Sequence, residues 1–122
     1  MPVLESDWKK FKELREIALD RFCQGGLADV KTISENDALS AHTRYRMLYR
    51  LMRDRDKDIV ETFDDNGQSR SSARMGLWLM VMHDLLSDAE LSVLSESAVS
   101  AVRDVVRQPY EIQWIEETVR KD

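Results

Sequence analysis

The chain has 122 residues, enough for one domain to enclose a hydrophobic core without support from a metal or a disulfide. Its residues are 43% hydrophobic and 34% charged, with only four glycines and two prolines, which excludes a disordered, collagen-like or turn-rich β protein. We therefore expect one all-α domain over residues 1–122, a bundle of five or six helices, whose net charge of -5 excludes a general attraction to nucleic acid or anionic lipid.

Cysteine content and apolar runs bear on where the protein works. Cys23 is the only cysteine, so it cannot form an internal disulfide, and the first residues lack the pattern of a secretory signal. The densest apolar run, residues 77–82, is far shorter than the ~20 residues of a membrane-spanning helix. We therefore expect a cytoplasmic protein with no membrane segment.

The first predicted helix covers residues 7–24, and Ser6 precedes it as a candidate N-cap. Apolar residues at helical spacing give this helix one inward face, made of Trp8, Phe11, Leu14, Ala18, Leu19 and Phe22. The pair Gly25 and Gly26 predicts its end. Residues 27–35 are less periodic and form either a short helix or a connector.

The longest predicted helix covers about residues 38–65 and ends at Asn66 and Gly67. Apolar residues at helical spacing predict its inward face, made of Ala38, Ala41, Tyr45, Leu48, Tyr49, Met52, Ile59, Val60 and Phe63. The next predicted helix, about residues 72–86, is apolar around most of its circumference. This pattern favours a central helix that is antiparallel to the long one.

Further helices are predicted toward the C-terminus. Ser87 and Glu90 have the spacing of a capping box and open a helix. The apolar spacing then allows either one helix over residues 88–108 or a break at Ser95 and a restart, of which we favour the break. A last helix is predicted over about residues 110–120.

No catalytic or metal-binding motif is recognised in the sequence. Asp54, Asp56 and Asp58 alternate like the start of a calcium loop, but the glycine and the glutamate that such a loop needs are missing. His42 and His83 lie on different predicted helices, and neither follows a carboxylate at the spacing of a metal motif. We therefore expect a protein that is not an enzyme and uses no cofactor.

A basic stripe follows the longest predicted helix, where basic residues recur at intervals of four, three and four: Arg46, Arg50, Arg53 and Lys57. Arginine beside an aromatic residue is common where proteins bind phosphates or acidic surfaces. Acidic residues three or four positions away can neutralise this charge within the helix, which favours a solvated face. A nucleic-acid-associated regulator that uses the stripe is the alternative.

Specific DNA binding is not expected. Residues 88–106 have the layout of a helix-turn-helix, but the second helix offers only Arg103 and Arg107 to the groove. Glu96 and Asp104 oppose these two arginines. Such a helix is poorly suited to reading base edges.

Two apolar surfaces remain once each helix has buried its main face. Met47 and Leu51 project away from the inward face of the longest helix, and Tyr110 and Trp114 project opposite the apolar side of the last helix. Aromatic residues and methionine are typical of protein interfaces, although a bundle can also cover two faces of one helix. Both interpretations remain open.

Charged residues also appear on faces predicted to point inward. Asp56 lies within the inward face of the longest helix, and Arg74 and Arg15 occupy comparable positions on neighbouring helices. A buried carboxylate without a partner costs several kcal/mol or takes up a proton. We therefore expect Asp56 to pair with Arg74 or Arg15, with the Trp78 indole as a further donor.

The sequence favours a protein-interaction module that is not an enzyme, with a second copy or another protein as its partner. The leftover apolar surfaces predict self-association. The first alternative is the regulator that uses the basic stripe, and the second is a small-molecule or enzymatic pocket built on the charges predicted to be buried.

Overall fold

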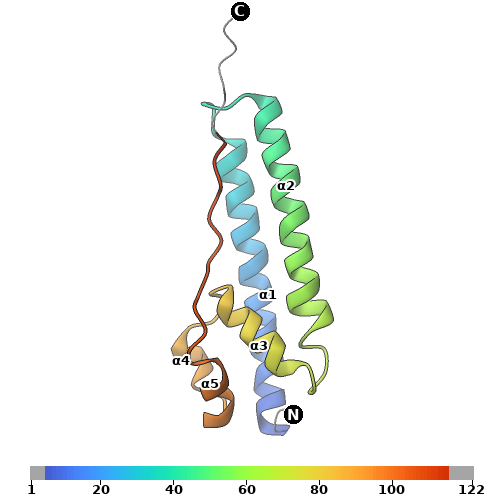
Figure 1. Ribbon diagram of the computed structural model, residues 1–122, viewed down its shortest axis with the longest axis vertical. Helices are drawn as coiled ribbons and strands as arrows, with labels where there is room; N and C mark the ends of the chain where they lie inside the picture. The colour runs from blue at the N-terminus through green and yellow to red at the C-terminus, as the bar shows by residue number, and fades with distance from the viewer. Residues whose placement is uncertain (1–4, 116–122) are drawn as a thin grey trace, which may run out of the picture.

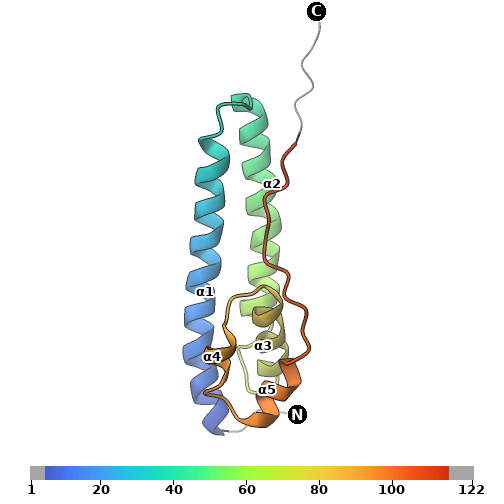
Figure 2. The ribbon, with the colours of Figure 1, turned by 90° about the vertical axis from the view of Figure 1, so that its left-hand side faces the viewer.

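A computed structural model describes residues 5–115, and within them the protein is all-α with no strand. Two long antiparallel helices form a hairpin, and the short helices gather at one end of it (Figures 1 and 2). The predicted all-α bundle is confirmed. In chain order its elements are α1 (Glu5–Ser34), α2 (Ala41–Ile59), the π-helix η1 (Val60–Asp65), α3 (Ala73–Met82), α4 (Asp88–Leu91) and α5 (Glu96–Val102).

Helix α1 continues through the two glycines that were predicted to end it. Glycine is only about 1 kcal/mol less favourable than alanine inside a helix, so packing further along is enough to hold the helix together. Ile33 is 1% exposed, and the Asp29 carboxylate accepts a hydrogen bond from Arg55 of α2 at 2.7 Å. Residues 27–35 are therefore mostly the last part of α1 and not a separate element.

The inward face predicted for α2 is largely wrong. Tyr45, Tyr49 and Met52 are 73%, 65% and 52% exposed, whereas Met47 and Arg55 are buried. The side of α2 that packs against α1 is thus turned away from the tyrosines. The predicted inward face combined residues from two different sides of the helix.

The π-helix η1 explains why the predicted inward face included both Phe63 and Tyr45. In an uninterrupted α-helix, residues about five full turns apart, such as Tyr45 and Phe63, lie on the same side. A π-helix has i to i+5 hydrogen bonds, so residues before and after it no longer lie on the sides that α-helical spacing predicts. Phe63 is therefore buried at 1% exposure while Tyr45 points to solvent.

Helix α3 is the central apolar helix, as predicted, although it ends at Met82 and not at residue 86. Its buried residues pack with the inward faces of α1 and α5 in one core, which includes Phe11, Leu14, Ala18, Phe22, Phe63, Leu77, Met80, Val81, Leu86, Leu91, Leu94, Ala98 and Val102. Gly76 lets α3 approach the preceding turn closely, since a Cβ there would lie 3.0 Å from the Gly67 Cα.

Local capping signals specify the two short helices. Ser87 and Glu90 form the predicted capping box at the start of α4. The predicted break at Ser95 is confirmed, because Ser95 is the N-cap of α5 and its side chain accepts from the Ala98 amide. Asp7 of α1, only 4% exposed, accepts hydrogen bonds from the Ser95 amide at 2.8 Å and the Ser95 hydroxyl at 2.5 Å.

Residues 103–115 form a C-terminal strap that runs back along the hairpin without helical structure beyond residue 102 (Figure 2). The predicted helix over residues 110–120 is therefore wrong for 110–115, and the remainder lies outside the described residues. The amide of Gln108 donates to the Met82 carbonyl at 2.6 Å, which ties the strap to the end of α3.

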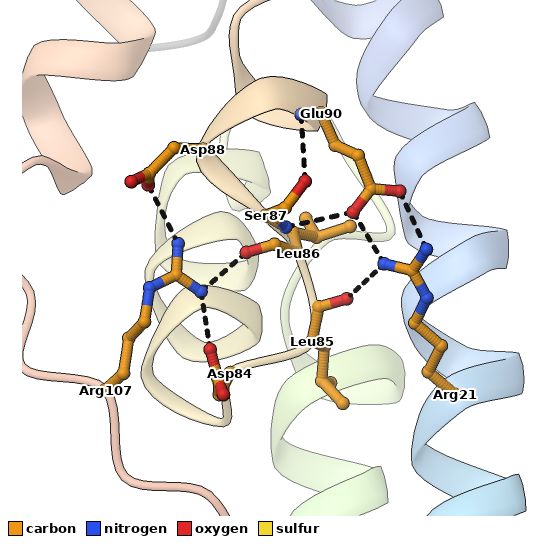
Figure 3. A network of polar contacts seen from close by, with 8 residues as sticks. All are labelled: Arg21, Asp84, Leu85, Leu86, Ser87, Asp88, Glu90 and Arg107. Carbon is orange, nitrogen blue, oxygen red and sulfur yellow. Dashed lines mark hydrogen bonds and ion pairs between the residues drawn. The ribbon is translucent and has the colours of Figure 1, made fainter.

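Arg107 fixes the beginning of the strap to the turn between α3 and α4 (Figure 3). Its guanidinium donates to the Leu86 carbonyl at 2.5 Å and to the carboxylates of Asp84 and Asp88 at 2.9 and 3.1 Å. One side chain thereby satisfies three acceptors around a single turn. This contact sets the position from which the strap crosses the hairpin.

Arg21 of α1 holds the other side of the same turn (Figure 3). It donates to both carboxylate oxygens of Glu90, at 2.6 and 2.9 Å, and to the Leu85 carbonyl at 2.9 Å. These bonds, with the one from the Ser87 amide, hold the pKa of Glu90 at about 2. The ion pair thus joins α4 to α1.

The depressed pKa of Glu90 predicts a small loss of stability in acid. The ionised carboxylate stabilises the fold above the unfolded pKa of 4.5, and this contribution falls as the pH drops from 4.5 toward 2. Because Arg21 is 47% exposed, we expect less than about 1 kcal/mol. Urea unfolding of Glu90→Gln should differ from the unchanged protein at pH 7 and converge with it near pH 2. A difference that stays constant with pH would contradict this assignment.

Candidate functional site

The predicted cluster of buried charges is not formed. Asp56 is exposed, because α2 turns that side to solvent. Arg15 donates instead to the Phe63 carbonyl at 2.6 Å and lies over the Phe63 ring, while Arg74 donates to the Ser97 hydroxyl at 3.3 Å. The prediction failed for the same reason as the predicted inward face of α2, from which it was derived.

Arg55 of α2 is buried instead, at 8% exposure. It donates to Asp29 at 2.7 Å, and its guanidinium lies 4.1 Å from the centre of the Tyr110 ring. Sequence reasoning missed this pair because residues 27–35 were not assigned firmly to a helix. Helical spacings of three and four residues through Gly26, Asp29 and Ile33 would have placed Asp29 on the inward side.

Tyr110 anchors the strap to the hairpin. Its hydroxyl donates to the Asp58 carboxylate, and its ring packs edge-on against Phe22 and stacks on His83. Burial raises the pKa of the Tyr110 phenol, and burial lowers the pKa of His83. Both groups are therefore neutral at pH 7, and the anchor is an aromatic cluster of Phe22, His83 and Tyr110 in which Arg55 lies over the Tyr110 ring.

The residues predicted to form a partner surface meet within the chain. Met47, Leu51, Tyr110 and Trp114 line one cavity of about 350 Å³ between the hairpin and the strap. Met47 is buried at 5% exposure, Leu51 and Tyr110 are half-buried, and Trp114 is 49% exposed. The two leftover surfaces thus face one cavity within the chain, and of their four residues only Trp114 is exposed.

The basic stripe lies on the surface. Arg46, Arg50, Arg53 and Lys57 are all exposed. Arg46 donates to the His42 Nε2 at 3.1 Å, and Arg53 donates to Asp54 at 3.3 Å and lies 5.9 Å from the centre of the Tyr49 ring.

The tyrosines expected in the core lie beside the stripe. A shallow hollow of about 360 Å³ is lined by His42, Tyr45, Arg46, Tyr49, Arg50 and Arg53. Continuing along the helix, the same exposed side includes Met52, Asp56 and Val60. We call this side the α2 face, defined by His42, Tyr45, Arg46, Tyr49, Met52, Arg53, Asp56 and Val60.

Residues 5–115 contain no metal-binding group of side chains and no membrane-spanning helix. In this part of the chain, no three His, Cys, Asp or Glu side chains are grouped so that they could hold a metal ion. None of its helices combines the length and apolar character needed to cross a membrane. No family model, no curated protein and no solved structure matches the chain. The α2 face, with the exposed side chains of Tyr45, Tyr49 and Met52, is the strongest candidate site within the described residues.

Proposed function

We propose that the protein is a non-enzymatic interaction module that associates with a second copy of itself through the α2 face. The observation that carries this proposal is the exposure of Tyr45, Tyr49 and Met52, at 73%, 65% and 52%, on successive turns of one helix. Tyrosine, methionine and arginine are the residue types enriched at interface centres. Here all three types share one rigid face.

The free energy of burying apolar surface also favours association. Burying apolar area contributes about 25 cal/mol per Å², and two exposed tyrosines with a methionine offer a large share of such area. The face lies on a helix that is already folded, so little conformational entropy is lost on binding. A helix of this length is about 28 Å long, which suits a small interface with an affinity in the micromolar range.

Nucleic-acid binding is the second candidate, because three exposed arginines stand beside two exposed tyrosines. Phosphate binding grows with the number of basic contacts, and this face offers few. Asp54 and Asp56 lie one and three residues beyond Arg53, and the chain carries a net charge of -5. We expect any such binding to be weak, non-specific and lost on adding salt.

The proposal is tested by sedimentation equilibrium over a range of protein concentrations. The unchanged chain should exceed its monomer mass of 14.2 kDa as the concentration rises. Tyr49→Glu places a carboxylate in the centre of the face and should raise the dimer dissociation constant at least about tenfold. Trp114→Glu is the matched control, because Trp114 has comparable exposure on the strap and should leave the dissociation constant unchanged.

Two results would contradict the proposal. One is a monomer mass for the unchanged chain at every concentration. The other is an equal loss of association in Tyr49→Glu and Trp114→Glu, which would place the contact elsewhere or make it non-specific.

A further inference from the structure

Charge is divided between the two halves of the α2–η1 segment. Residues 41–53 carry four arginines and no carboxylate, whereas residues 54–65 carry six carboxylates and two basic residues. The face reflects this division, because Arg46 and Arg53 lie in the first half and Asp56 in the second. The segment is thus basic at its beginning and acidic at its end.

Arg46 and Asp56 both have charge available for a partner. Arg46 is exposed, and the contact described for its guanidinium is a hydrogen bond to the His42 Nε2 at 3.1 Å, with no carboxylate. Asp56 is exposed, and it forms no ion pair with any of the described residues. Within residues 5–115, neither charge takes part in a salt bridge.

The direction in which two copies pair decides whether these charges attract or repel. A two-fold interface repeats each contact, so every attraction or repulsion counts twice. Parallel α2 helices would bring arginines against arginines and carboxylates against carboxylates. Antiparallel helices bring the basic half of each copy against the acidic half of the other, and they also oppose the two helix dipoles favourably.

We infer that two copies pack their α2 faces antiparallel about a two-fold axis near Leu51, with Arg46 of each copy opposite Asp56 of the other. The inference rests on the self-association proposed above and adds its geometry. Leu51 marks the axis because it lies midway between Arg46 and Asp56 in the sequence. Tyr49 and Met52 then lie beside the axis as the desolvated centre, and the ion pairs lie toward the rim.

Charge exchange between these two positions tests the pairing. Arg46→Glu sets a glutamate opposite Asp56 of the partner, and Asp56→Arg sets an arginine opposite Arg46 of the partner. Each repulsion occurs twice, so each single variant should raise the dissociation constant at least about tenfold. Lys12→Glu, an exposed charge reversal on α1, is the control and should leave the constant unchanged.

Recombining the changes restores the attraction only in an antiparallel pair. The double variant Arg46→Glu, Asp56→Arg should form a homodimer with a dissociation constant within about threefold of the unchanged protein. An equimolar mixture of the two single variants should form a heterodimer of similar strength. In a parallel pair each residue faces its own copy, so the unchanged protein, the single variants and the double variant would all oppose like charges. The single variants would then not lose association, and the double variant would not differ from them. Circular dichroism melting confirms that each variant is folded.

The outcomes separate this inference from the function on which it rests. If the unchanged protein dimerises and Tyr49→Glu prevents it, but the double variant does not recover, then the antiparallel pairing is wrong and self-association through the face stands. Single variants with unchanged dissociation constants also overturn the pairing. A monomeric unchanged protein overturns both.

Discussion

Replacing Arg55 by alanine is expected to lower the free energy of unfolding by about 3 kcal/mol. The substitution leaves the carboxylate of Asp29 without its partner at 2.7 Å and removes the cation that lies 4.1 Å from the Tyr110 ring. Urea unfolding followed by circular dichroism measures the loss. Arg53→Ala is the control, because Arg53 is exposed two residues away, and it should cost less than about 0.5 kcal/mol.

A second consequence of Arg55→Ala concerns the strap. Without Arg55, the Tyr110 ring loses one of its contacts with the hairpin, and the strap should be held less firmly. The amide of Gln108, which donates to the Met82 carbonyl, should then exchange with deuterium faster than in the unchanged protein. A stability loss below about 1 kcal/mol, with no change in this exchange, would show that Arg55 does not hold the strap to the hairpin.

Two glycine-to-alanine substitutions are expected to change stability in opposite directions. At Gly76 a Cβ would lie 3.0 Å from the Gly67 Cα and 3.1 Å from the Gly67 amide nitrogen, both backbone atoms that move only if the turn shifts. We expect Gly76→Ala to cost about 2 kcal/mol despite the better helix propensity of alanine.

Gly25 provides the matched comparison. It lies inside α1, and a Cβ there would meet nothing within 4 Å. Gly25→Ala should therefore stabilise the protein by up to about 1 kcal/mol through helix propensity alone. Thermal unfolding of both variants checks the pair. A loss of stability in Gly25→Ala would contradict a continuous α1, and a neutral Gly76→Ala would contradict the close approach of α3 to the turn.

Features specified by local signals were predictable from the sequence. The inward face of α1 follows from apolar spacing, and Phe11, Leu14, Ala18 and Phe22 are all buried. The capping box at Ser87 and the break at Ser95 follow from side chains that bond to amides only three residues away. Such signals do not depend on what packs against the helix.

Features decided by tertiary contacts were not predictable in this way. The glycine pair at 25–26 looks like a helix end, but Asp29 and Ile33 meet α2 and carry α1 beyond it. Tyrosine fits either a core or a surface, so spacing alone placed Tyr45 and Tyr49 inside. The π-helix η1 has no simple sequence signature, and the prediction joined Phe63 to Tyr45 because it assumed an unbroken α-helix.

The strap shows the same limit. Residues 110–115 have apolar spacing that fits a helix, yet the Tyr110 hydroxyl donates to Asp58 and its ring covers Arg55. These contacts bring together residues more than 50 positions apart in the sequence. They place Tyr110 beside Met47 and Leu51 at one cavity, whereas the α2 face, which we propose as the partner surface, stays exposed.

Oxidative footprinting of the unchanged protein tests the central claim most directly. Met52 lies on the α2 face and Met75 on α3, and both are 52% exposed, so hydroxyl radicals should oxidise them at similar rates in a dilute monomer. When the concentration is raised well above the dimer dissociation constant, the account predicts that Met52 becomes protected while Met75 does not. Equal oxidation of the two methionines at every concentration would contradict self-association through the α2 face.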